Sequence, residues 1–465
     1  MRRLREVKPR RYRKPITVWA SFVVIIGSSS LLVARAGDAS PSSRPGAVTG
    51  DTSIWTTYGG TNTRNAIQST DAPTAPLHVA WRSNAQRGEI YGEPLIADNR
   101  VFVATEYDTV EALSASTGRL IWSRSIGKAV PSGDLPCGDI GPTVGITSTM
   151  VIDPSNSRLF VSGETLVGSR VHHVLLAMSP STGATLFRRD LDRAHWSADA
   201  ELQRGALGLD NGNVLVGFGG NYGDCGSYHG YLMAVPESGT GSTLVYQVPT
   251  ANQGAIWGPA GMSVERDGDI FVATGNGASH SRFDMSNAVI ELSSTLKMKS
   301  WFAPINWESD NATDHDLGST APILLPHNRV FEVGKQGVAY LLNARRLGGI
   351  GHEIASQKVC NSRGASAYHS GYLYLACPDS GMIALRLRSG HLTLAWHSSA
   401  ANGSPTLGGG LVWNVSGNNL LGLSPSTGRI VDTIDAPAIE HFAAPSIADH
   451  LVVVAGATQV VAYRG

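Results

Sequence analysis

Short runs of β-branched and apolar residues, separated by polar or glycine-containing turns, repeat along most of the chain. In each repeat a strand that starts with a small residue or Pro is followed by a turn, a β-branched strand and a loop. A strand of the pattern apolar-x-Ala-apolar, a Ser/Thr-Gly turn and a last strand then complete the unit. The first copy, residues 94–123, reads "PLIADNRVFVA" and then "VEALSASTGRLIWS". This pattern predicts antiparallel hairpins, and no helical periodicity of useful length competes with it.

The unit occurs eight times. The copies begin at Pro94, Thr147, Gly205, Gly258, Ser319, Gly364, Gly403 and Ala443. Four short antiparallel strands in each copy match the size of a propeller blade, and the extra length of the earlier copies is expected in loops. The predicted fold is therefore an all-β, eight-bladed β-propeller, with a solenoid of the same units as the alternative.

The eighth unit ends at Gly465, one strand short of a full blade. The segment "LHVAWRS", residues 77–83, has the form of a fourth strand and lies before the first unit. If this segment pairs with the last unit, strands from both ends of the propeller close the ring and no edge strand is left exposed. The offset predicts a closed ring.

The N-terminus divides into segments of distinct character. Residues 1–14 are basic and read as a cytoplasmic tail, and residues 15–36 contain the apolar stretch Ile16 to Val33. Positive charge before such a stretch predicts translocation of the body of the chain, so a single-pass membrane protein with an extracytoplasmic body is expected. Ala34-Arg35-Ala36 also fits cleavage near Ala36, which would release a secreted protein. Residues 37–52 read as a flexible linker and residues 53–465 as the propeller.

Charge is distributed unevenly along the chain. Residues 1–36 hold nine Lys or Arg and one acid, which leaves 28 basic and 36 acidic residues in the rest, a net charge of about −8. Phosphate binding draws its affinity from clustered Lys and Arg, so this composition weighs against nucleic acid as a partner.

A turn motif in the repeats is shared with a known family. "SPSTG" occurs at residues 179–183 and 424–428, beside "SASTG" at 114–118. The form apolar-Ala-x-x-x-x-Thr-Gly-x-x-x-Trp resembles the blade signature of pyrroloquinoline quinone (PQQ)-dependent, or quinoprotein, dehydrogenases and of secreted bacterial PQQ-repeat proteins. The resemblance covers most of residues 90–465 and implies that tryptophans in this position pack between blades. These are Trp81, Trp122, Trp301 and Trp396.

Polar residues gather at one face of the predicted ring. Because successive strands reverse direction, loops after second strands and segments before first strands lie on the same face. The residues in those places are Glu164, Asn276 and Lys335, after second strands, and Trp257, Asp314 and Asp316, before first strands. The sequence therefore predicts one site on that face.

The quinoprotein resemblance gives these residues roles. It implies that Glu164, Asn276 and Asp316 bind calcium, that Asp316 is also the catalytic base, that Trp257 stacks on PQQ, and that Lys335 contacts the quinone oxygen during catalysis. Oxygen ligands suit a hard cation, and an aromatic face suits a planar cofactor.

Each of these residues also has an ordinary structural interpretation. Asn276 can serve a turn, Glu164 and Lys335 can be solvated charges, Trp257 can pack between blades, and Asp316 can anchor a turn. The adjacent cysteine pair of many alcohol dehydrogenases in the family is absent, and so is a Cys-x-x-Cys-His haem motif. With these departures from the family, cofactor binding is better supported than turnover.

Four cysteines in an exported chain predict disulfides. Cys360 and Cys377 begin and end neighbouring strands of one hairpin, and Cys137 and Cys225 remain as the second pair on one face. A loop with Asp224, Tyr228 and His229 either lines a substrate entrance or is braced by these side chains. The remaining histidines His172, His173 and His195 have no metal-ligand spacing with any Cys and are interpreted as structural.

Three functions fit the sequence. The first is an extracytoplasmic oxidoreductase that oxidises an alcohol or sugar, small or polymeric, with PQQ and calcium and passes electrons to a membrane quinone or soluble acceptor. The second is a non-catalytic propeller that presents loops to envelope proteins, as the outer-membrane assembly lipoprotein with the same repeat does. A carbohydrate-binding or cell-wall module is the third.

Overall fold

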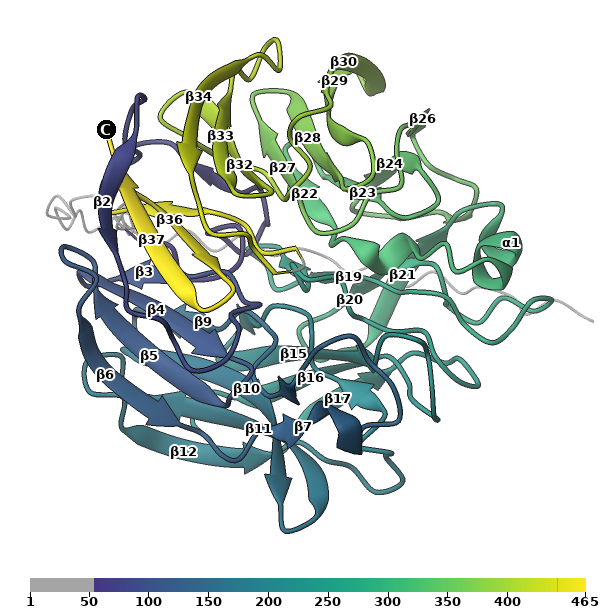
Figure 1. Cartoon of the computed structure of the whole chain (residues 1–465). Coiled ribbons are helices and arrows are strands. Elements are labelled where there is room, and N and C mark those ends of the chain that lie inside the picture. The colour runs from purple at the N-terminus through teal and green to yellow at the C-terminus, as the bar shows by residue number, and fades with distance from the viewer. Residues whose placement is uncertain (1–53, 441) are drawn as a thin grey trace, which may run out of the picture. The chain divides into compact units, whose positions relative to one another are not determined.

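The computed structural model describes residues 54–440 and 442–465. The predicted N-terminal tail, membrane segment and linker lie outside the described residues. The described chain is almost entirely β-structure and forms eight blades around a common centre, each built on four strands, with a fifth short strand added to three of the sheets (Figure 1). This arrangement confirms the predicted eight-bladed propeller.

The strands of each blade follow one another from the inside of the ring to the outside. Blade 1 has β3 (Leu95–Ala97), β4 (Arg100–Thr105), β5 (Thr109–Ser114) and β6 (Leu120–Ser125). Blade 2 has β9 (Val151–Asp153), β10 (Arg158–Val167), β11 (Arg170–Met178) and β12 (Thr185–Asp190). Blade 3 has β14 (Gly208–Asp210), β15 (Asn213–Gly220), β16 (Tyr231–Pro236) and β17 (Leu244–Gln247). Blade 4 has β18 (Ser263–Val264), β19 (Ile270–Ala273), β20 (Val289–Leu292) and β21 (Met298–Ala303).

The second half of the ring repeats this order. Blade 5 has β22 (Ile323–Leu325), β23 (Arg329–Val333), β24 (Val338–Asn343) and β26 (Ala355–Lys358). Blade 6 has β27 (Ser366–His369), β28 (Tyr372–Cys377), β29 (Gly381–Arg388) and β30 (His391–Ser398). Blade 7 has β31 (Thr406–Gly408), β32 (Leu411–Ser416), β33 (Asn419–Leu423) and β34 (Ile430–Asp435). Blade 8 has β35 (Ser446–Ala448), β36 (Leu451–Gly456), β37 (Gln459–Arg464) and β2 (His78–Arg82).

Smaller elements join the edges and loops of the blades. They are β1 (Ile67–Gln68), β7 (Val130–Pro131), β8 (Thr143–Val144), β13 (Glu201–Leu202), β25 (Gly349–Ile350), the 3-10 turns η1 (Ser132–Asp134) and η2 (Leu317–Ser319), and the short helix α1 (Trp307–Ala312). Among the described residues, no helix is both long and apolar enough to cross a bilayer.

Blade 8 is completed by a strand from the other end of the propeller. The strand β2 pairs antiparallel with β37, with His78 opposite Arg464 and Trp81 opposite Ala462. Figure 1 shows this purple strand beside the yellow C-terminal strands. The pairing confirms the predicted closure, which leaves no unpaired edge at the junction of the two ends.

Tryptophans on outer strands dock on the Ser-x-Ser-Thr-Gly turn of the next blade. Their indole N–H groups donate to the carbonyl of the second turn residue: Trp81 to Ala115 (2.7 Å), Trp122 to Pro180 (3.0 Å) and Trp396 to Pro425 (2.9 Å). The last turn residue must be glycine, because Gly118 has a φ of 68° and a Cβ there would lie 2.4 Å from the Trp81 ring. Trp301 differs, since it stacks on Phe283 at a centroid distance of 4.6 Å.

Residues 54–72 run around the ring and bond to one inner strand after another. Backbone hydrogen bonds join Trp55 to Ile96, Thr56 to Ile152, Asn62 to Val264, Thr63 to Leu324, Asn65 to Tyr368, Ala66 to Leu407 and Asp71 to His450. Tyr58 of this segment packs among alanines from five blades, Ala206, Ala260, Ala321, Ala365 and Ala444. The segment therefore fills the middle of the ring and ties the blades together.

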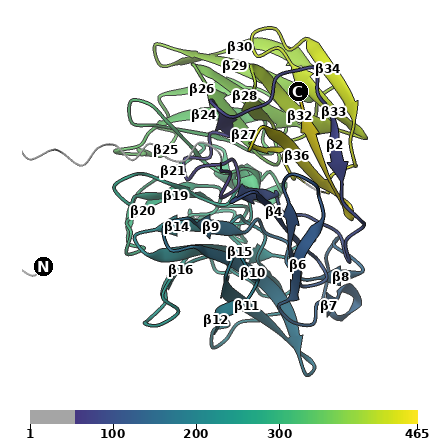
Figure 2. The same cartoon turned by 90° about the vertical axis from the view of Figure 1, so that its left-hand side faces the viewer.

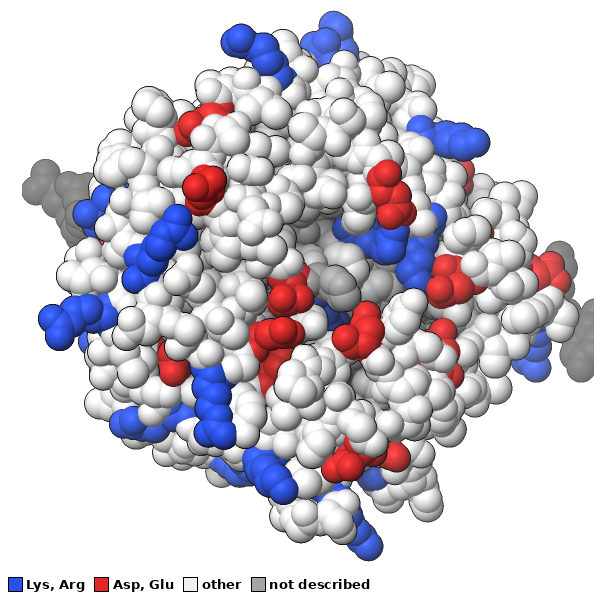
Figure 3. Space-filling view, viewed as in Figure 1, with Lys and Arg blue, Asp and Glu red and all other residues white. Residues whose placement is uncertain are grey.

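The loops after second strands lie on one face together with the short hairpin of β7 and β8. Thr165 in β10 bridges to Ala129 beside β7, and Thr143 Oγ1 in β8 donates to Glu106 O in the β4–β5 turn. Figures 1 and 2 show this hairpin at one face of the propeller, and Figure 3 shows that the same face is hollowed near its middle and rimmed by acidic and basic side chains.

Both predicted disulfides are present. Cys137 is joined to Cys225 with a Cα–Cα distance of 6.1 Å, and Cys360 to Cys377 with a Cα–Cα distance of 5.8 Å. The first joins the loop between blades 1 and 2 to a loop of blade 3, and the second fixes the entry to blade 6.

Candidate functional site

Four of the five predicted site residues meet where blades 4 and 5 adjoin. Trp257 precedes β18, Asn276 follows β19, Asp316 precedes η2 and Lys335 follows β23. The chain reverses at each of these points, so the four residues come from neighbouring loops on one face, as the repeat pattern predicted. We call Trp257, Asn276, Asp316 and Lys335 the Asp316 group.

Asp316 is the centre of this group, and both of its carboxylate oxygens have partners. The backbone N–H of Asn276 donates to Oδ1 at 2.6 Å, and Lys335 Nζ lies 2.7 Å from Oδ2. The backbone N–H of Lys335 also donates to the Asp316 carbonyl at 2.9 Å. Asp316 is only 4% exposed, so its charge is held by the protein and not by water.

The ion pair has two opposing electrostatic influences. Burial raises the pKa of the Asp316 carboxyl, and the Lys335 ammonium works against this rise. Burial alone would lower the pKa of Lys335, but the carboxylates of Asp316 and Asp314 raise it above its ordinary value. Lys335 therefore stays charged and is shared between buried Asp316 and exposed Asp314, whose Oδ1 lies at 3.1 Å.

Trp257 forms the aromatic side of the group. Lys335 Nζ lies 5.4 Å from the centre of its ring, a distance suited to a cation–π contact. Phe442 also contacts Trp257, with ring centroids 6.3 Å apart and planes inclined by 54°. Gly275 allows the close approach of the loops, because a Cβ there would come 2.6 Å from Asp316 Oδ1.

Two asparagines that the sequence did not single out as site residues hold these loops in place. Asn287 Oδ1 accepts the N–H of Leu317 at 2.7 Å, and Asn287 Nδ2 donates to Asn311 Oδ1 at 2.8 Å. Asn311 Oδ1 also accepts the N–H of Gly277 at 3.1 Å. Both are buried amides outside the blade strands, Asn287 in a loop and Asn311 in the short helix α1, so the repeat pattern gives no signal for either.

Glu164 lies apart from the Asp316 group. It sits inside β10, opposite His173, and not in a loop after the strand, because the β10–β11 hairpin is longer than the repeat predicted. Glu164 is 1% exposed, neither carboxylate oxygen has a hydrogen-bond partner, and its nearest charges include Glu106 and Asp108. Burial and these like charges raise its pKa well above its ordinary value. The interpretation of Glu164 as a solvated loop residue is wrong.

The loop with Asp224, Tyr228 and His229 is braced by its own side chains. Tyr228 Oη donates to Asp224 Oδ1 at 2.5 Å, and the Tyr228 ring packs with Ala200 and Ala255 against Trp257. The His229 N–H donates to Glu201 Oε1 at 3.1 Å. Packing against Tyr228 thus helps to fix the position of Trp257.

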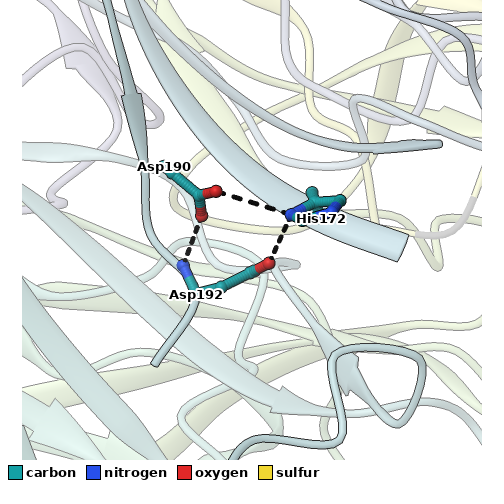
Figure 4. Close-up of side chains that lie close together, drawn as sticks. All are labelled: His172, Asp190 and Asp192. Carbon is teal, nitrogen blue, oxygen red and sulfur yellow. Dashed lines mark hydrogen bonds and ion pairs between the residues drawn. The ribbon is translucent and has the colours of Figure 1, made fainter. Parts of the chain in front are cut away.

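His172 forms a small polar cluster on blade 2 (Figure 4). Its Nδ1 lies 2.7 Å from Asp192 Oδ2 and 3.4 Å from Asp190 Oδ2, and Asp190 Oδ1 accepts the N–H of Asp192 at 2.9 Å. Asp192 Oδ1 also accepts the His173 N–H at 2.9 Å. The cluster fixes the chain where it leaves β12, which agrees with a structural role for His172.

Comparison with known proteins identifies the fold. Residues 42–264 match the family model described as outer membrane protein assembly factor BamB. The structure is similar to quinohemoprotein alcohol dehydrogenase from Comamonas testosteroni, with a TM-score of 0.68 and 16% identity over 88% of this chain and 80% of that one. It is also similar to a europium-containing methanol dehydrogenase (TM-score 0.64, 14% identity, 83% and 86% covered). BamB from Moraxella catarrhalis gives a TM-score of 0.55 at 12% identity, with 82% and 99% covered.

The chain has the propeller fold of these quinoprotein dehydrogenases and of BamB, and we call it a quinoprotein-like propeller for this similarity. The similar structures share its fold at low identity, and no curated protein sequence matches it.

The residues of the quinoprotein-like propeller fit a quinone cofactor better than they fit calcium. Trp257 offers an aromatic face, and Lys335 a charged donor beside it. PQQ stacked on Trp257 would compete with the Phe442 side chain for contact with that ring. The donor set for calcium is not gathered, because both oxygens of Asp316 are engaged and no contact joins Glu164 to Asn276 or Asp316 among the described residues.

The quinoprotein-like propeller has one hollow near this site and a second hollow on the opposite face. A cavity of about 260 Å³ lies between blades 6, 7 and 8 and is lined by Arg363, Asn402, Ser404 and Phe442, among others. A shallower hollow of about 590 Å³ includes Thr63 of the encircling segment. Because Phe442 contacts Trp257 and also lines the first cavity, that cavity adjoins the Asp316 group.

The centre of the ring holds a buried arginine that sequence reasoning missed. The Arg204 guanidinium lies 5.8 Å from the ring centres of both Tyr91 and Phe442, and its Nη1 donates to the Thr147 carbonyl at 3.2 Å. Glu106 is its strongest charged neighbour. Arg204 lies in the segment before β14. The small residues of that segment predicted the start of a blade and gave no signal of a buried arginine.

Proposed function

We propose that this propeller is an extracytoplasmic quinoprotein-like oxidoreductase, which binds PQQ against Trp257 and oxidises an alcohol or sugar. The observation that carries the proposal is the buried Asp316–Lys335 pair, 2.7 Å between Nζ and Oδ2, placed beside an aromatic face. A carboxylate that is shielded from water and held next to an ammonium is suited to take a hydroxyl proton. The basic and apolar N-terminus and the two disulfides support an extracytoplasmic location.

PQQ, when bound, supplies an orthoquinone that takes up the two electrons leaving the substrate carbon. Asp316 takes the proton of the substrate hydroxyl once Lys335 Nζ turns away from Oδ2. Lys335 is the residue that would hold a quinone oxygen of the bound cofactor, and its charge would favour negative charge on that oxygen. The Asn276 N–H keeps Asp316 oriented through Oδ1. No step is assigned to calcium, because its expected ligands are not together.

Binding and turnover of the full-length chain in detergent test the proposal. PQQ should quench tryptophan fluorescence, and an alcohol and sugar panel should reduce a dye in its presence. Asp316→Asn should lower turnover by at least about 100-fold and preserve PQQ binding, because it removes the base and keeps the shape. Asp314→Asn is the matched control: Asp314 contacts the same lysine but is exposed, so turnover should stay within about twofold. A full-length chain that binds no PQQ, with or without calcium, would overturn the proposal.

A non-catalytic scaffold that contacts cell-envelope proteins is the second candidate. The contact of Phe442 with Trp257 favours it, because a side chain of the protein already packs against the proposed cofactor platform. Complementation of a deletion strain distinguishes the two functions. A scaffold keeps full function with Asp316→Asn, whereas an oxidoreductase loses it, and protein level and a native-like circular dichroism spectrum control for folding.

A further inference from the structure

Three buried acids gather on the same face as the Asp316 group, at blades 1 and 2. Glu106 and Asp108 lie in the turn between β4 and β5, and Glu164 lies in β10. Their exposed fractions are 2%, 0% and 1%. We call Glu106, Asp108 and Glu164 the acidic trio.

The trio converges on Gly145, in the segment that leads to blade 2. The Gly145 N–H donates to Glu106 Oε2 at 2.8 Å, and the Gly145 carbonyl accepts the N–H of Glu164 at 2.8 Å. A Cβ on Gly145 would lie 2.9 Å from Asp108 Oδ1. A glycine is favoured here because a side chain would collide with Asp108 and with the Glu106 carbonyl, while Glu164 reaches this position through its backbone N–H.

Most oxygens of the trio lack partners. Glu106 Oε1 and both carboxylate oxygens of Asp108 and of Glu164 are buried without a hydrogen bond from the described residues. Within that part of the chain, the Gly145 N–H and the Thr147 hydroxyl donate to Glu106 Oε2. The Thr165 hydroxyl lies near Asp108 and favours its ionised form. A buried carboxylate with no donor is costly to keep ionised.

The cations that face the trio are partly used elsewhere. Arg204 acts on Glu106, but it also donates to the Thr147 carbonyl and lies against two aromatic rings. Arg188 acts on Asp108 and donates to the Ile126 carbonyl. No ion pair reaches Glu164 among the described residues, and its charged neighbours are all acids.

We propose that the acidic trio binds a hard divalent cation, for which calcium is the best match, and that Glu164 serves this site and not one with Asn276 and Asp316. Five unpartnered carboxylate oxygens are a ligand set of the type calcium takes. As placed, one oxygen from each acid does not fall within 4.8 Å of the other two, so binding requires at least one side chain to rotate. The proposal does not depend on PQQ binding or on turnover.

Calcium affinity of variants separates this site from the alternative. The full-length chain in detergent is stripped with chelator and titrated with calcium by equilibrium dialysis. Glu106→Gln and Asp108→Asn should each lower calcium affinity by at least about tenfold, because each removes a ligand. Asn276→Ala and Asp316→Asn should stay within about twofold. Glu332→Gln is the matched control, since Glu332 is a buried acid of blade 5 with one unpartnered oxygen.

The reverse result overturns the proposal: loss of affinity in Asn276→Ala with affinity kept in Glu106→Gln would place Glu164 in a shared site with the Asp316 group. A wild-type chain that binds no calcium also overturns it. If circular dichroism shows that a variant does not fold, the calcium titration of the unaltered chain still tests whether the protein binds calcium. Two separate sites predict a calcium affinity that saturating PQQ leaves unchanged, whereas a shared site predicts that PQQ raises it.

Discussion

The Asp316 group and the acidic trio are two sets of buried carboxylates on one face, and the protein compensates their charges differently. Asp316 has a backbone N–H on one oxygen and the Lys335 ammonium on the other. Glu164, equally buried, has neither. Glu164 lies in a second strand and Asp316 in the segment that enters a first strand, and both places lie at this face.

The difference shows that position in the repeat does not determine the chemistry of a residue. Asp316 receives its partner from the loop after β23 in its own blade, whereas the charged residues that act most strongly on Glu164 are further acids. A buried carboxylate without a partner in the chain needs a proton or a cation. Asp316 thus has a cation from its own chain, whereas no cation from the described residues pairs with Glu164.

The largest effect is expected when the paired acid loses its partner. Lys335→Met should lower the free energy of unfolding by about 3–5 kcal/mol at pH 8, because it leaves the Asp316 charge buried and unpaired. Urea unfolding followed by circular dichroism measures it. Arg363→Met is the control, since Arg363 pairs with exposed Asp379 and the loss of this pair should cost about 1 kcal/mol or less. An equally small loss for Lys335→Met would mean that Asp316 needs no cation.

The unpaired acid should behave in the opposite way. In chelator at pH 8, Glu164→Gln should raise the free energy of unfolding by about 2–3 kcal/mol, because it removes a carboxyl that is costly to ionise. Burial raises the folded-state pKa of Glu164, so its contribution to stability is present below the unfolded pKa and is lost as pH rises. The gain should therefore vanish near pH 4. Destabilisation in chelator at pH 8 would show that Glu164 has a partner within the chain.

The sequence predicted what depends on local pattern. Eight blades, the closing strand at Trp81 and the docking of Trp122 on a Ser-x-Ser-Thr-Gly turn all follow from short motifs that repeat. The Cys360–Cys377 bridge followed from hairpin geometry. The sequence also predicted that the four residues of the Asp316 group share one site, because the place of each residue in the repeat determines the propeller face on which it lies.

The remaining features depend on long-range contacts that no local pattern carries. The encircling segment has no periodicity, and Tyr58 finds its place only because alanines of five blades surround it. Glu164 was misplaced because β10 runs on past the expected strand end. Arg204 and Glu106 meet across blades, so neither residue's own segment signals the other.

Glu332 gives an intermediate case between the two groups. Thr320 Oγ1 and the Val333 N–H donate to Glu332 Oε1 at 2.5 and 3.1 Å, while Oε2 is unpartnered. Burial raises its pKa to about 8, so the stability it contributes is full below the unfolded pKa and falls as pH rises toward 8. Glu332→Gln should therefore gain about 1 kcal/mol at pH 8 and nothing near pH 4, by urea unfolding at both values. A gain in the free energy of unfolding as large as that of Glu164→Gln would mean that the two neutral donors do not reduce the cost of burying the Glu332 charge.

The smallest effect tests whether the two groups are separate. Phe442 touches Trp257 of the Asp316 group and Arg204 beside the trio, so it is the side chain through which one site could sense the other. Phe442→Ala should raise PQQ affinity about two- to tenfold, because the ligand no longer displaces an aromatic contact worth about 0.5–1.5 kcal/mol. Phe283→Ala, which removes a similar contact on Trp301, should leave PQQ affinity unchanged. Calcium affinity should stay constant in both variants. A change in calcium affinity in Phe442→Ala alone would mean that Phe442 couples the acidic trio to the cofactor platform, and the two groups would then act as one site.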